Sequence, residues 1–85
     1  MFNIKNKLIK SEVVKELESN YCCLKECVRY KKICEDNLII ELRTCEYNQD
    51  KETVQDLKRD ILRVENTIDD LKLNIKACLE VLTNL

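Results

Sequence analysis

Apolar residues recur at alternating steps of three and four through the second half of the chain. They are Val54, Leu57, Ile61, Val64, Ile68, Leu71, Ile75, Cys78, Leu82 and Leu85. The positions between them are largely polar. This is the a/d heptad pattern of a coiled coil, with β-branched residues prevailing at a and leucine at d. The pattern predicts one long helix over residues 51–84.

The first half of the chain carries the same spacing with two exceptions. Its a/d positions are Val14, Leu17, Tyr21, Leu24, Val28, Lys31, Glu35, Leu38, Leu42 and Cys45. Lys31 and Glu35 interrupt the apolar pattern. We expect a helix over residues 11–47 and a turn over 48–50, where the chain is polar and Asp50 is a good N-cap for the second helix.

The two apolar patterns fit each other in an antiparallel hairpin. If Val54 lies opposite Cys45, the pairing continues without a gap until Leu85 lies opposite Val14, and every a position meets a d position. The predicted turn falls at the midpoint of this pairing. A parallel homodimer through the second helix is the alternative, but it sets Asp60 against Glu65 of the second chain. We therefore predict one all-α domain, residues 1–85, folded as an antiparallel two-helix coiled-coil hairpin.

Residues 1–10 overhang the hairpin in this register and carry exposed apolar side chains. Ser11 followed by Glu12 can cap a helix, so a short separate N-terminal helix or arm that folds back is expected. Its apolar residues, which need cover, are Phe2, Ile4, Leu8 and Ile9. Lysines interleave with them, as in an interfacial membrane anchor, but a packing helix is the preferred interpretation.

Composition excludes most enzyme classes. Sixteen acidic and fifteen basic residues leave a net charge of −1, and glycine, proline, histidine and tryptophan are absent. Phosphate-binding glycine loops and histidine-based catalysis or zinc binding are therefore missing. No apolar run reaches the roughly 18 residues of a membrane span. We expect no enzyme activity and no cofactor.

The six cysteines have three possible roles. Cys23, Cys27, Cys34 and Cys45 form a stripe beside the predicted line of helix contact, and small buried apolar side chains are their ordinary role. A Cys22–Cys78 bridge is one alternative. A zinc site built from Cys23 and Cys27 of two protomers is another. The first ten residues show no secretory signal, which favours reduced thiols and a cytoplasmic location, of the cell or of a host cell.

A basic stripe follows the first helix. It consists of Lys25, Arg29, Lys32 and Arg43. A solvated helix face is the ordinary explanation. Phosphate contacts are the alternative, without aromatic stacking groups or a net positive charge to support them.

A single two-helix seam is a small core for 85 residues, so self-association is expected, most simply as two hairpins in a four-helix bundle. The predicted interface comprises the cysteine stripe, the N-terminal apolar residues, and Leu62 and Leu73 on the second helix. The expected function is that of a small interaction module that binds a larger protein, as adaptor, scaffold piece or stoichiometric inhibitor. Richness in Ile, Lys and Asn suggests an AT-rich genome, such as that of a phage or virus. A binder of nucleic acid or of a phosphorylated ligand is the second hypothesis, and a cysteine-based zinc module is the third.

Overall fold

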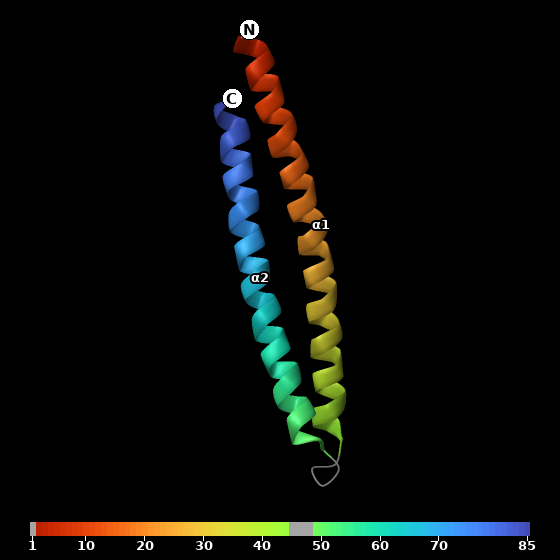
Figure 1. Cartoon of the computed structure of the whole chain (residues 1–85). Coiled ribbons are helices and arrows are strands. Elements are labelled where there is room, and N and C mark those ends of the chain that lie inside the picture. The colour runs from red at the N-terminus through yellow and green to blue at the C-terminus, as the bar shows by residue number, and fades with distance from the viewer. Residues whose placement is uncertain (1, 45–48) are drawn as a thin grey trace.

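Two helices pack side by side in antiparallel orientation and form the whole described structure (Figure 1). The computed structural model describes the backbone of residues 2–44 and 49–85. Within these ranges it describes the side chains from residue 6 onward. Helix α1 spans Phe2–Arg43 and helix α2 spans Lys51–Asn84. The molecule is a rod with extents of 71 × 15 × 14 Å. The predicted all-α hairpin is confirmed, and α2 has its predicted bounds.

Helix α1 is continuous from Phe2, so the predicted separate N-terminal helix is wrong. Ser11 lies inside the helix and does not cap a new one. The physical reason is that the chain offers no glycine or proline at which to break. At its other end α1 stops at Arg43, whereas the predicted helix continued to residue 47. Residues 45–47 lie outside the described part of the chain.

The end of α1 beside the turn is closed by side-chain hydrogen bonds to its last carbonyls. The Gln49 side-chain amide donates to the carbonyl oxygens of Leu42 (3.2 Å) and Thr44 (3.1 Å), and the Thr44 hydroxyl donates to the carbonyl of Ile40 (3.0 Å). These bonds satisfy acceptors that a helix end leaves free. Gln49 therefore substitutes for the glycine that usually ends a helix.

Asp50 is the N-cap of α2, as predicted. Its carboxylate accepts hydrogen bonds from the backbone N–H groups of Glu52 and Thr53 and from the Thr53 hydroxyl, the last at 2.8 Å. The backbone N–H of Asp50 in turn donates to the Glu41 carboxylate of α1 at 2.8 Å. The start of α2 is thus capped locally and also tied to the opposite helix.

The core of the hairpin is the line along which the two helices meet, called the seam below. Its fully buried residues are Cys34, Val64, Ile68, Ile75 and Cys78. The half-buried residues of α2 include Val54, Leu57, Ile61, Leu71 and Leu82. All of these α2 residues belong to the predicted heptad pattern. The prediction for α2 is therefore confirmed except at Leu85, which is exposed.

The α1 side of the seam differs from the prediction. Leu17, Leu24, Lys31 and Leu38 line it as expected, but the second row of residues is Asn20, Cys27, Cys34 and Glu41. The predicted row of Tyr21, Val28, Glu35 and Leu42 is exposed. The helix is rotated so that its second row in the seam is shifted by one residue, which places Cys34 in the interior in place of the charged Glu35. Two polar residues enter instead, and both have partners: Asn20 contacts the Cys78 sulfur at 4.0 Å, and Glu41 accepts the Asp50 N–H.

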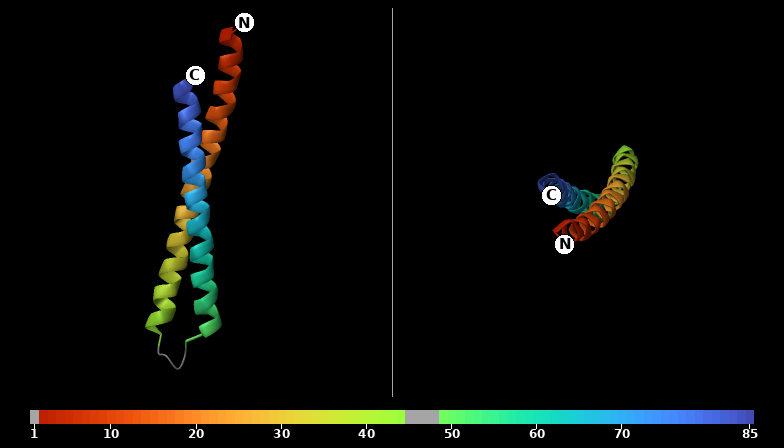
Figure 2. Two further views of the ribbon diagram at one scale, coloured as in Figure 1. Left: turned by 90° about the vertical axis from the view of Figure 1, so that its left-hand side faces the viewer. Right: turned by 90° about the horizontal axis from the view of Figure 1, so that it is seen from above.

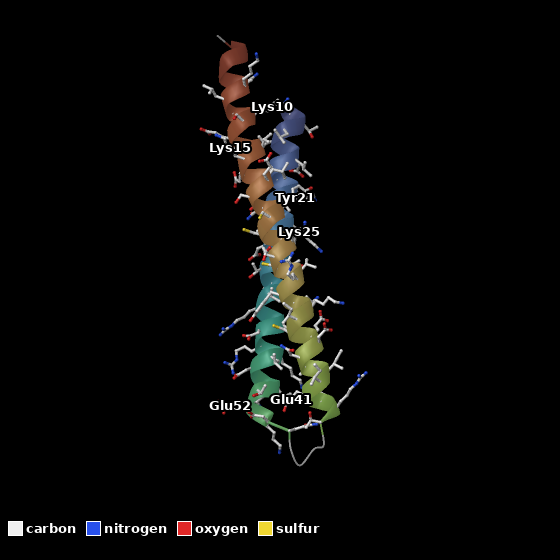
Figure 3. The ribbon with its side chains drawn as sticks, turned by 90° about the vertical axis from the view of Figure 1, so that its right-hand side faces the viewer. Lys10, Lys15, Tyr21, Lys25, Glu41 and Glu52 are labelled. Atoms are coloured by element: carbon white, nitrogen blue, oxygen red, sulfur yellow. The ribbon has the colours of Figure 1, made fainter. Side chains whose placement is uncertain are left out.

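The register also differs from the prediction. Leu85 was expected opposite Val14, whereas Leu82 and Leu85 share a shallow hollow with Asn6, Lys7 and Lys10. In Figure 3, Lys10 lies level with the C-terminal end of α2. The offset is about one helical turn, so less of α1 overhangs than expected. Seen from the side in Figure 2, the helices cross at a shallow angle, and α1 still extends beyond α2.

Candidate interaction surface

The cysteines do not form one stripe beside the seam, although Cys34 has the predicted role of a small buried apolar side chain. Cys34 is only 3% exposed and lies in the seam, and Cys27 is half-buried in the same row. The stripe is thus wrong for these two residues, because the rotation of α1 turns them toward α2. Cys23 is exposed, and Cys45 lies outside the described residues.

The described thiols offer neither a bridge nor a metal cluster. Cys22, Cys23, Cys27, Cys34 and Cys78 are all free. Cys22 is exposed and Cys78 is buried, so the considered Cys22–Cys78 bridge is not formed. Cys23 is exposed, whereas Cys27 is half-buried, so the two thiols lie in different environments. Within residues 2–44 and 49–85, no group of three or more acidic or cysteine side chains is placed to hold a metal ion.

The basic stripe of α1 is exposed to solvent. Lys25, Arg29, Lys32 and Arg43 all lie on the surface. Arg29 is paired within its own helix, because its guanidinium lies 3.8 Å from the Glu26 carboxylate. Figure 3 shows Lys25 one turn beyond Tyr21 along α1. The stripe therefore has the ordinary appearance of a solvated face, with one cation already balanced.

Two contacts between the helices identify the two sides of the hairpin. On one side the Lys31 ammonium lies 3.3 Å from the Glu65 carboxylate. On the other side Tyr30 lies near Asp60. The pKa of Tyr30 is raised above its ordinary value, first by its hydrogen bond with the Cys34 thiol and then by the negative charge of Asp60. The first side is called the Glu65 side and the second the Asp60 side.

A row of apolar side chains beside the seam is left uncovered on α1. Tyr21, Val28 and Leu42 are each about half exposed, at 50%, 51% and 49%. Val14, which is half-buried, and the exposed Glu35, its one charged member, belong to the row at the same seven-residue spacing. The row is called the Val28 row. Sequence reasoning missed it as a surface because it placed these residues in the seam.

Further large apolar side chains are exposed outside the Val28 row. Near the turn of the hairpin they are Tyr30, Ile33, Ile39 and Ile40, and elsewhere they are Leu8, Ile9, Leu62, Leu73, Leu79, Val81 and Leu85. Leu8, Ile9, Leu62 and Leu73 were predicted to need cover, and the described structure does not provide it. The side chains of Phe2 and Ile4 lie outside the described ones. The sequence analysis did not identify the exposed isoleucines near the turn. Three consecutive apolar residues, Leu38–Ile39–Ile40, indicate them, because a single seam cannot bury all three side chains.

The fold and this surface define a class of protein: a two-helix coiled-coil hairpin with exposed apolar side chains on both helices. Comparisons of the chain with protein-family models, with curated proteins and with solved structures give no match. Of the two described helices, neither is long and apolar enough to cross a membrane.

Proposed function

We propose that the chain is a small helical protein-interaction module that self-associates and acts by binding a larger protein. In this proposal it is an adaptor, a scaffold piece or a stoichiometric inhibitor in a reducing cytoplasm, of a cell or of a phage- or virus-infected host, and not an enzyme. The proposal is supported by the uncovered apolar side chains, which a protein in water keeps small in area unless they meet a partner.

The amount of exposed surface is the observation that carries the proposal. The chain exposes 6990 Å², whereas a folded monomer of 10.1 kDa exposes roughly 5,300 Å². The excess is about 1,700 Å². A standard protein interface covers roughly 800 Å² on each partner. The excess is therefore enough for one face that meets a second copy and one that meets a larger protein.

The small core of the hairpin also supports the proposal that the chain binds partners. Only five side chains of the described residues are buried, and two of them are cysteines. Burying one apolar side chain stabilises a fold by roughly 1.5–3 kcal/mol, whereas ordering each residue costs roughly 1.5 kcal/mol. A partner that covers the apolar rows adds the burial that the hairpin lacks.

Native mass spectrometry together with sedimentation equilibrium at micromolar concentration tests the proposal. We expect a homo-oligomer without a bound metal ion. A well-folded monomer across the whole concentration range would contradict self-association. A bound zinc ion or a retained phosphorylated ligand would favour one of the two other hypotheses.

A further inference from the structure

Helix α1 carries two alternative rows for helix packing, and the hairpin uses one of them. Both rows flank the same central residues: Leu17, Leu24, Lys31 and Leu38. The row that contains Cys27 and Cys34 faces α2. The Val28 row lies on the other flank, at the spacing that pairs helices, and has no helix against it in the hairpin.

The Val28 row lies on the Glu65 side of the molecule. Lys31 precedes the row's Glu35 by four residues and reaches Glu65 of α2 on this side, whereas Tyr30 and Asp60 lie on the other. Residues at seven-residue spacing from Glu65 continue the same side of α2. They are Lys51, Lys58, Lys72 and Leu79, all exposed. The face is therefore a mainly apolar row on α1 that is bordered on α2 by Glu65, three lysines and one leucine.

We infer that a second copy of the chain covers this face, with the two α1 helices antiparallel and related by a two-fold axis at Val28. The inference rests on the proposed self-association and specifies its geometry. In such a pairing, residues equally far before and after the axis face each other, so both copies use the same surface.

The spacing of the row supports this centre. Val28 meets Val28 of the second copy, and Val14 meets Leu42 of the second copy. The one charged residue of the row, Glu35, meets Tyr21, whose phenol hydroxyl can donate a hydrogen bond to the carboxylate. A shift of the axis by half a heptad sets Glu35 against Val28 or Val14, where its charge has no partner on the row.

The exposed area agrees with a second copy as the occupant, and the net charge of the chain does not oppose it. A net charge of −1 per chain gives little long-range repulsion between copies. The excess exposed surface of about 1,700 Å² exceeds the roughly 800 Å² that each partner contributes to a standard interface.

Cysteine cross-linking tests the position of the axis. Val28→Cys is made in a chain whose Cys22, Cys23 and Cys45 are replaced by serine, and a mild oxidant is added. We expect a covalent dimer, because a residue on a two-fold axis meets its own copy. Leu42→Cys in the same chain is the matched control and is expected to stay uncross-linked, because Leu42 faces Val14.

Charge reversal tests the Tyr21–Glu35 pairing. Tyr21→Glu sets two carboxylates against each other at two symmetric places, and we expect it to raise the dimer Kd by at least about tenfold. Adding Glu35→Lys to the same chain is expected to restore the Kd to within about threefold. Leu73→Glu, at an exposed leucine of α2 whose neighbours one turn away are also exposed, lies outside the face and is the control with unchanged Kd.

The outcomes separate this inference from the proposed function. An oligomer in which Val28→Cys does not cross-link and Tyr21→Glu has no effect overturns the assigned face, and self-association stands. A monomer at every concentration, with intact helicity by circular dichroism, overturns both.

Discussion

Cys34 and Cys23 lie on the same helix but in opposite environments. Cys34 is 3% exposed, whereas Cys23 is exposed. Both are free thiols of one chemical type. Their different environments follow only from the rotation of α1, which sequence periodicity did not predict. A substitution that is harmless at one cysteine must therefore be costly at the other.

Cys34→Glu is expected to lower the free energy of unfolding by at least about 2 kcal/mol, because it places a carboxylate in the seam, where Lys31, one helical turn away, is already paired with Glu65. Cys23→Glu adds the same charge at an exposed position and is expected to change it by less than about 0.5 kcal/mol. Urea unfolding followed by circular dichroism measures both. Equal effects of the two variants would show that Cys34 does not lie in the seam.

At the scale of the element, the start of α2 depends on Asp50. The pKa of its carboxyl group is lowered from 3.8, chiefly by the hydrogen bond from the Thr53 hydroxyl and then by that from the Thr53 backbone N–H. A lowered pKa means that the ionised carboxylate stabilises the folded state. This contribution is present above pH 3.8 and is lost as the pH falls through the folded-state value.

Asp50→Asn keeps a capping side chain but removes the charge near the helix N-terminus. We expect the variant to be less stable than the natural chain at neutral pH, with a gap that closes as the pH falls below 3.8. Urea unfolding across this range measures the gap. Asp70→Asn, on the exposed face of the same helix, is the control for loss of one carboxylate. A gap that widens in acid would contradict the capping role.

Lys31 is the charged residue of the central row of α1. It lies 3.3 Å from Glu65, and the two side chains are 32% and 45% exposed. A partly exposed ion pair contributes about 0–1 kcal/mol, whereas an apolar side chain buried at a seam contributes roughly 1.5–3 kcal/mol. Lys31→Leu is therefore expected to raise the free energy of unfolding by about 1 kcal/mol. Lys32→Leu, one residue further and exposed, is the control; a loss of stability in Lys31→Leu alone would mean that the ion pair outweighs apolar burial.

Sequence periodicity predicted α2 almost completely and α1 only in part. In α2 the two heptad rows are apolar almost throughout and the other positions are largely polar, so the pattern favours one packing face. In α1 the central residues Leu17 and Leu24 have apolar neighbours on both flanks, Cys27 on one and Val28 on the other. Which flank faces inward depends on packing against α2, and a heptad pattern does not contain that information. The register was misplaced for the same reason, since the choice of row on α1 also determines which residues of the two helices lie opposite each other.

At the scale of the whole molecule, the apolar rows that were missed are the main candidates for function. That the chain needs partners was predicted from its length and the small size of its core, without knowledge of these exposed residues. Where the partners bind could be predicted only from the exposed residues themselves. Cys27 and Cys34 of the predicted cysteine stripe lie in the seam, and in the inference made above the Val28 row takes the place of the stripe.

Self-association makes the midpoint of thermal unfolding depend on protein concentration, because the folded dimer and unfolded chains differ in stoichiometry. Unfolding enthalpy is about 0.7 kcal/mol per residue near 60 °C, so a dimer of 85-residue chains requires roughly 120 kcal/mol, and its Tm rises by about 4 °C per tenfold concentration. Val28→Glu is expected to remove this dependence and lower the Tm, whereas Leu73→Glu keeps it. Differential scanning calorimetry over a hundredfold range of concentration measures the slope. A flat Tm for the natural chain would mean that the hairpin folds alone and that its exposed rows await a different protein.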